Sequence, residues 1–296
     1  MGAIPWPNLT IELVTLGFAI LCVYEAWKLG VGRFTAFLTS ILFGLAIEVY
    51  FTTQYSGYSY GPFLIDPIIL GSNVPVWVGC GWGVIIFVAM AASDRMDIPW
   101  GVRPVVDALL AVTLDFALDP IAEALGFWHW SRPVPPEQMF YGVPFDNFCG
   151  WLLIVGSFSL FVRLGFRIWG PGVHIWRDTL IPIVALVPCI LSVVVCQFGL
   201  DAAYQIAGEP VVFAAVLGAP LVPVLYYTRK LCTTSTIPWY LAAIPVCYHG
   251  MLLLFLFACG VYKQESTLIV LMPLAAFASV VGYGGVFSSL RVQHEP

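Results

Sequence analysis

Long apolar segments recur along the chain, each about as long as a helix that crosses the roughly 30 Å hydrocarbon core of a bilayer. Breaks rich in Pro, Gly and Asn separate them. Nine such segments can be counted, at residues 9–29, 34–52, 74–92, 103–125, 147–168, 179–200, 211–228, 238–262 and 266–287. The pattern predicts an all-α integral membrane protein in which residues 1–296 form a single domain, one polytopic bundle of about nine transmembrane helices.

The composition agrees with a membrane location. Hydrophobic residues make up 60% of the chain, charged residues 10%, and the mean hydropathy is +0.91, whereas a soluble domain carries roughly 25% charged residues. The net charge of −5, with no basic run longer than Arg229–Lys230, excludes nucleic acid as a partner. The eight cysteines are scattered and form no C-x-x-C pair, which favours small core residues over a disulfide or metal framework.

The basic residues gather on one side of this predicted topology. Only Arg132 and Lys263 fall on the other side. The remaining ten of the twelve are Lys28, Arg33, Arg95, Arg103, Arg163, Arg167, Arg177, Arg229, Lys230 and Arg291. The positive-inside rule then predicts an outer N-terminus and a cytoplasmic C-terminus. We expect a multi-pass protein of the cytoplasmic (inner) membrane, whose first segment is an uncleaved anchor because it lacks a basic start and a cleavage site.

Three acids four residues apart interrupt the fourth apolar segment: Asp115, Asp119 and Glu123. On a helix this spacing places them on one face. An intramembrane acid costs roughly 2.5–3.5 kcal/mol on insertion scales, so it usually faces the bundle interior or a wet cavity. Glu48, in the second segment, is expected at a similar depth. No Lys or Arg is expected at that depth. The sequence therefore predicts a protonated carboxyl group beside an ionised one, as general acid catalysis requires, with structural bonding between helices as the alternative.

Two other acids have a basic residue within one helical turn. Asp107 follows Arg103 by four residues, and Glu25 precedes Lys28 by three. Both pairs are typical of ion pairs at the membrane interface.

Aromatic and polar residues surround the outer ends of the fourth and fifth segments. They are Trp128, Trp130, Tyr141, Asp146, Asn147 and Trp151. One interpretation is an aromatic belt at the membrane interface. The other is the wall of an apolar pocket whose rings stabilise a carbocation. Because these residues follow the acid stripe directly, both interpretations stay open at this point.

Two adjoining motifs carry a family resemblance. They read Asp115-x-x-x-Asp119-Pro120-x-Ala122-x-x-x-Gly126-x-Trp128-x-Trp130 and Tyr141-Gly142-Val143-Pro144-x-x-Asn147-Phe148-x-Gly150-Trp151. This region resembles the integral-membrane carotenoid 1,2-hydratases, the carotenoid biosynthesis proteins of the bisanhydrobacterioruberin and γ-carotene hydratase type. Glu48 and residues 58–60 and 73–75 look like upstream elements of that family. Beyond residue 170 only the hydropathy is compatible.

The resemblance implies a lyase, a hydro-lyase that adds water to a terminal C=C bond of a long isoprenoid without a cofactor or a metal. Its partners would be a lipophilic carotenoid substrate, the bilayer and other enzymes of the same pathway. Asp115 or Asp119 would protonate the alkene. Glu48, or Asp146 with Asn147, would deprotonate the attacking water. Trp128, Trp130, Tyr141 and Trp151 would shield the cation.

Three other functions compete. A membrane terpene cyclase would use the same protonation without capturing water. An isoprenoid prenyltransferase would share Asp115-x-x-x-Asp119, but the chain lacks an Asn-Asp-x-x-Asp run and basic residues for a diphosphate. A proton-coupled transporter also uses intramembrane carboxylates, but no internal repeat is detectable here.

Overall fold

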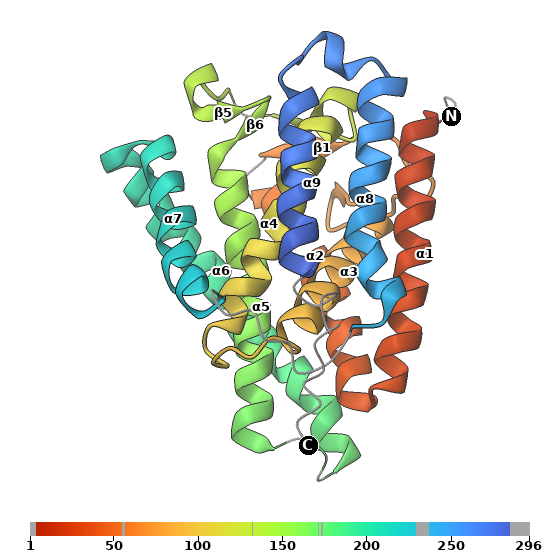
Figure 1. Cartoon of the computed structure of the whole chain (residues 1–296), viewed down its shortest axis with the longest axis vertical. Coiled ribbons are helices and arrows are strands. Elements are labelled where there is room, and N and C mark those ends of the chain that lie inside the picture. The colour runs from red at the N-terminus through yellow and green to blue at the C-terminus, as the bar shows by residue number, and fades with distance from the viewer. Residues whose placement is uncertain are drawn as a thin grey trace, which may run out of the picture.

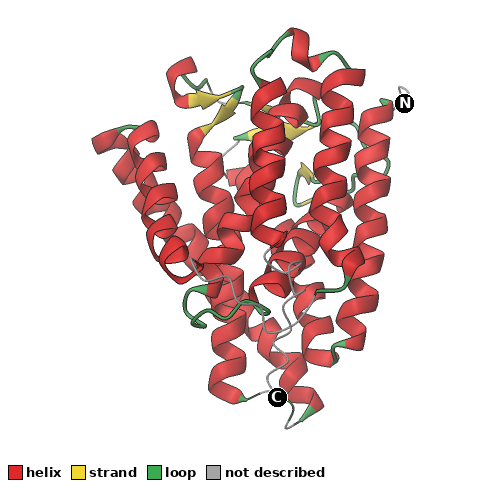
Figure 2. Cartoon of the chain, in the orientation of Figure 1, coloured by secondary structure: helices red, strands yellow, loops and turns green. Residues whose placement is uncertain are grey.

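The computed structural model describes residues 4–54, 57–131, 133–170, 172, 174–228 and 237–284. Arg132, Arg229, Lys230 and Arg291, which entered the topology prediction, lie outside the described residues. The described chain forms a bundle of helices with short strands at one end (Figures 1 and 2). The helices are α1 Trp6–Lys28, α2 Val31–Gln54, α3 Val76–Ser93, α4 Arg103–Leu125, α5 Phe145–Trp169, α6 Ile175–Ala207, α7 Glu209–Thr228, α8 Trp239–Ala258 and α9 Leu268–Gly284.

The all-α membrane class predicted from the sequence is confirmed. Among the described residues, seven helices are long and apolar enough to cross a membrane: α1, α2, α3, α5, α6, α7 and α8. α9 is apolar but shorter, and α4 differs from the others by carrying Arg103 and four acids. Each of the nine predicted apolar segments overlaps one helix. The number of spans and their orientation stay predictions.

The acid-bearing helix α4 lies inside the bundle, where it packs on α3, α5, α8 and α9. It ends at Gly126, whose φ of 71° is left-handed and therefore suits a residue without a Cβ. In contrast, α7 packs mainly on α5 and α6 at the left edge of Figure 1, and few of its residues are buried. The acids predicted to face the bundle interior are thus on the helix that has neighbours on most sides.

Short antiparallel strands close the end of the bundle that the topology predicts to be outer (Figure 2). β1 (Tyr58–Tyr60) pairs with β4 (Trp128–Trp130). β2 (Ile68–Ile69) pairs with β3 (Ser72–Asn73), and β5 (Met139–Phe140) with β6 (Val143–Pro144). In the first pair Tyr58 opposes Trp130 and Tyr60 opposes Trp128. Because side chains alternate along a strand, these four rings share one face.

One buried acid attaches the loop after β1 to the first helix. Glu12 of α1 is fully buried and accepts backbone N–H groups from Leu64 at 2.7 Å and Ile65 at 2.9 Å. Gly61, in the same loop, runs so close to the end of α4 that a Cβ there would lie 2.2 Å from the carbonyl oxygen of Gly126. The loop is therefore fixed over the outer ends of α1 and α4.

At the other end of the bundle, the predicted pairing of Asp107 with Arg103 is wrong. Asp107 is fully buried and pairs with Arg163 of α5 at 3.0 Å, while Arg103 reaches Asp94 at 3.2 Å. Asp107 faces the neighbouring helix α5, which the spacing within α4 could not reveal. The second predicted pair, Lys28 with Glu25, is confirmed at 3.1 Å.

Close approach of α2 and α3 depends on Gly44. A Cβ at this position would lie 2.5 Å from the Cβ of Trp82 and 2.7 Å from its Cδ1. We expect Gly44→Ala to lower the free energy of unfolding by about 1–3 kcal/mol, because the two helices must move apart. The matched control is Gly17→Ala, where no atom lies within 4 Å. Thermal unfolding in detergent checks this; equal unfolding temperatures for the two variants would contradict it.

Candidate active site

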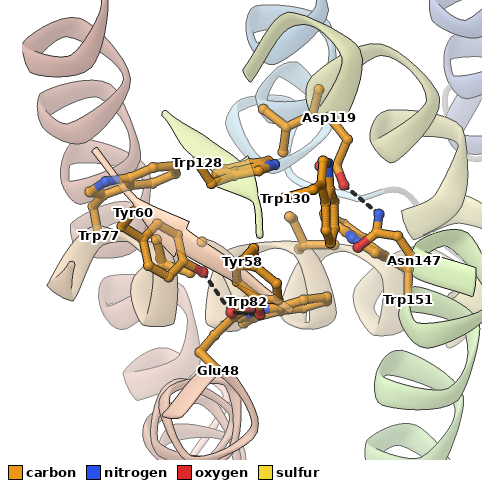
Figure 3. Close-up of a pocket in the computed structure, with 14 residues that line it drawn as sticks. Glu48, Tyr58, Tyr60, Trp77, Trp82, Asp119, Trp128, Trp130, Asn147 and Trp151 are labelled. Carbon is orange, nitrogen blue, oxygen red and sulfur yellow. Dashed lines mark hydrogen bonds between the residues drawn. The ribbon is translucent and has the colours of Figure 1, made fainter. Parts of the chain in front are cut away.

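A cavity lies between α2, α3, α4 and α5, beneath the β1–β4 pair (Figure 3). Its lining combines two carboxyl groups, one amide and seven aromatic rings: Glu48, Asp119, Asn147, Tyr58, Tyr60, Trp77, Trp82, Trp128, Trp130 and Trp151. A second cavity shares six of these residues and therefore adjoins the first. The second cavity adds polar side chains from Asp146 and from Gln197 of α6.

Glu48 of α2 is held by three hydrogen-bond donors. Its Oε2 accepts the hydroxyl groups of Tyr58 and, at 2.5 Å, of Tyr60, and its Oε1 accepts Nε1 of Trp82 at 2.7 Å. Figure 3 shows Tyr60 and Trp82 reaching it from different sides. Hydrogen bonds donated to a carboxylate favour its ionised form and so oppose the cost of burying its charge. Oε2 already accepts two hydrogen bonds, whereas Oε1 accepts one and keeps a lone pair for water.

Asp119 of α4 meets a different environment. It is 2% exposed, and its Oδ2 accepts Nδ2 of Asn147 from α5. Its Oδ1 has no hydrogen-bond partner within the described part of the chain. Pro120 follows directly inside the helix and supplies no backbone N–H to that turn. Asp119 thus lies at the cavity wall (Figure 3) with one oxygen bonded to Asn147 and the other buried.

Asp115 lies one turn earlier on the same face of α4. It is fully buried, and neither oxygen accepts a hydrogen bond from a described residue. Its carboxyl group interacts with that of Asp119. No described Lys, Arg or His forms an ion pair with either acid. Asp115 does not line either cavity, so it lies behind Asp119.

The aromatic rings lie against each other around the two carboxyl groups. Trp130 packs edge-on against Tyr58 with ring centroids 5.2 Å apart, and Trp128 against Tyr60 at 6.1 Å. Trp82 and Trp151 lie 4.5 Å apart. The strand pairing brings the first four together, although Tyr58 and Trp130 are far apart in sequence. The walls are therefore π-faces and edges from two helices, α3 and α5, and two strands.

The structure brings most of the sequence-predicted site residues together. Glu48, Asp119, Trp128, Trp130, Asn147 and Trp151 line the first cavity, and Asp146 lines the second. Tyr141 lies apart from both, in the β5–β6 turn with a φ of 51°, where its ring packs on Phe140. Glu123, the last acid of the stripe, lies outside the cavities, with its Oε1 3.8 Å from Nδ1 of His129. The catalytic and substrate-binding roles of these residues stay predictions.

Sequence reasoning missed Trp77, Trp82 and Gln197, and found Tyr58 and Tyr60 only through the family resemblance. Trp82 stands among Gly79, Gly81 and Gly83, a pattern that permits close packing of another helix. Gln197 is a single buried amide in a strongly apolar helix. The rule that singled out the intramembrane acids could have identified it.

Comparison with known proteins assigns the chain to a family. Residues 10–221 match the family of carotenoid biosynthesis proteins. The chain therefore belongs to that family, and it is a multi-pass membrane protein. Among curated proteins, a bisanhydrobacterioruberin hydratase from Haloarcula japonica is 30% identical over 113 residues. That match covers 37% of this chain and 35% of the relative, so the chain spans about a third of the relative's length. No solved structure matches significantly.

Proposed function

We propose that this protein is a carotenoid hydratase, which adds water across a terminal C=C bond of an acyclic polyene. Family membership and the hydratase relative support the class of substrate. The observation that carries the proposal is the contrast between two carboxyl groups on one aromatic cavity. Glu48 receives three donors, whereas Asp119 receives one amide and contacts a second buried acid.

The first step is protonation of the alkene. Two ionised carboxylates in contact, without a cation, repel each other strongly in a buried site, so Asp115 and Asp119 hold a proton between them. Asp119 lines the cavity and delivers that proton to the less substituted carbon of the C=C bond. The π electrons form the new C–H bond, and the other carbon becomes a tertiary cation. Asp119 is left as a carboxylate.

The second feature of the cavity is its ability to surround a cation. A positive charge over the face of Trp or Tyr is attracted by the ring quadrupole, by about 0.5–2 kcal/mol per ring. Trp128, Trp130 and Trp151 line the cavity with Tyr58. They also exclude other nucleophiles from the cation. This arrangement supports a longer-lived tertiary cation than water alone would permit.

The second chemical step is capture of the cation by water. Glu48 lies on both cavities, and the second is lined by the polar groups of Asp146, Asn147 and Gln197, which suit ordered water. As the oxygen of the water molecule bonds to the cation, Glu48 accepts a proton from that water. The product gains the atoms of one water molecule. When the proton on Glu48 passes back to the aspartate pair, the site is reset, without a change in oxidation state and hence without a redox cofactor.

Expression in a bacterial host that makes the acyclic carotenoid lycopene tests this function. We expect new pigments that are heavier by one or two molecules of water and more polar on chromatography, since each end of lycopene offers a terminal C=C bond. A host with the empty vector is the control. A new pigment of unchanged mass would instead indicate cyclisation or isomerisation, and unchanged pigments would contradict activity on this end group.

A further inference from the structure

A third cavity lies at the end of the bundle opposite the β1–β4 pair. The α1–α2 turn, the last turns of α3 and α5 and the first turns of α4 and α6 enclose it. It shares no lining residue with the first cavity, where the proposed reaction takes place. Its charged lining consists of four guanidinium and two carboxyl groups, those of Arg33, Arg103, Arg163, Arg167, Asp94 and Asp178. The cavity therefore carries excess positive charge.

One carboxylate is the common partner of three of these arginines. Asp94 accepts Nη2 of Arg33 at 2.6 Å, Nη1 of Arg103 at 3.2 Å and Nη1 of Arg163. Burial alone would raise the pKa of Asp94, but the charges of Arg163 and Arg33 hold it below its usual value. Asp94 is thus ionised at any physiological pH. Arg163 also pairs with Asp107 behind the cavity, so two carboxyl groups face three guanidinium groups and one positive charge stays unbalanced.

Arg103 and the exposed Arg167 each keep guanidinium donors that no described carboxyl group accepts. Nε of Arg103 is buried and has no hydrogen-bond partner among the residues that the structure describes. The guanidinium of Arg167 stacks over the Trp100 ring at 4.8 Å, and no described carboxyl group pairs with it. A guanidinium carries five N–H donors in a planar fork that matches carboxylate or phosphate oxygens. The cavity therefore contains more donors than its own acids can satisfy.

Backbone and apolar groups complete this lining. Gly30, Val31 and Gly32 lie at the start of α2, where first-turn N–H groups have no partner inside the helix and the helix dipole is positive. Met90 and Phe166 supply apolar surface beside the charges. A hydrocarbon carotenoid has no charge for these donors, so they do not suit the substrate proposed above.

We propose that this cavity binds a phosphate group, carried either by an anionic phospholipid headgroup or by free phosphate. Basic pockets between helices at the cytoplasmic end of membrane proteins are suited to phospholipid headgroups, and this end is the one predicted to be cytoplasmic. Bound phosphate would neutralise the excess charge of the arginines and connect the ends of α2, α3, α4 and α5. These four helices line the first cavity at their other ends. The proposal does not depend on the chemistry of that cavity.

Thermal unfolding of the purified full-length protein in neutral detergent, followed by tryptophan fluorescence, tests this site. We expect phosphatidylglycerol to raise the unfolding temperature and phosphatidylcholine to leave it nearly unchanged, since binding to the folded state alone stabilises it. Arg167→Gln should weaken the apparent affinity for phosphatidylglycerol about tenfold, by removing charge-assisted hydrogen bonds. Inorganic phosphate, titrated separately, distinguishes free phosphate from the lipid headgroup as the source.

The matched control is Arg177→Gln. Arg177 also stacks on a tryptophan, Trp176 at 5.6 Å, and lies near the same end, but it does not line the cavity. It should keep the wild-type response. Arg167→Lys, which keeps the charge without the fork, should fall between wild type and Arg167→Gln. The proposal is overturned if phosphatidylglycerol acts no more strongly than phosphatidylcholine and phosphate has no effect, or if Arg167→Gln and Arg177→Gln weaken binding equally.

Discussion

Asp119→Asn is expected to reduce hydration by about two to four orders of magnitude, the usual contribution of a positioned general acid. The amide keeps the size of the side chain but cannot deliver a proton to carbon. Asn147 can still hydrogen-bond the remaining oxygen, so the local packing around α4 and α5 should persist. The measurement is the rate of product formation by purified protein from an acyclic polyene in detergent, followed by mass spectrometry.

Asp97→Asn is the matched control, because Asp97 is an exposed aspartate outside both cavities. It should retain wild-type activity. Asp115→Asn should also inactivate, since an amide at position 115 would donate a hydrogen bond to Asp119 and favour its ionised form. Wild-type-like turnover in folded Asp119→Asn protein would remove Asp119 from the role of acid.

Glu48→Gln should reduce hydration by a similar two to four orders of magnitude, as expected for loss of a general base, but with a different product pattern. The acid can still form the cation, because Asp119 is unchanged, while the neutral amide cannot take a proton from water. Because glutamine keeps one acceptor oxygen, either the two tyrosines or Trp82 would also face an NH₂ group where they now donate to a carboxylate. The cation should then return to an alkene by losing a proton.

Deuterated water separates the two roles. In Glu48→Gln, the recovered substrate or its double-bond isomer should carry deuterium on carbon without gaining oxygen, whereas in Asp119→Asn it should carry neither. Glu265→Gln, at an exposed position of the chain, controls for the loss of one charge. Full hydration activity in Glu48→Gln would assign the base to another group, and Asp146 of the second cavity would be the next to test.

Most helices of the bundle could be predicted from the sequence, because bilayer thickness sets the length of the apolar segments that cross it. The spacing Asp115, Asp119, Glu123 also predicted correctly that the acids of α4 include buried ones, since a four-residue step repeats on one helix face. The partners of these acids could not be derived in the same way. Asn147 lies on another helix, and no local pattern specifies which helix packs against α4.

Long-range pairing explains the features that sequence reasoning missed. Trp82 reaches Glu48 because α2 and α3 approach closely at Gly44, which depends on the shapes of both helices. Tyr58 and Tyr60 are brought to the cavity by pairing of β1 with β4, and strands of three residues carry little periodic signal. The ion pair between Arg163 and Asp107 was missed for the same reason, because it joins two helices. Arg103, the partner expected within α4, pairs with Asp94 instead.

In the proposed mechanism, a carboxyl group buried beside an aromatic cavity gives a proton to the polyene and water completes the addition. A reaction of purified protein and an acyclic carotenoid in water labelled with heavy oxygen, under nitrogen, tests both steps. We expect a product that contains one labelled oxygen for each end that reacts, formed without molecular oxygen. A product with unlabelled oxygen, a need for molecular oxygen, or a product of unchanged mass would contradict this mechanism.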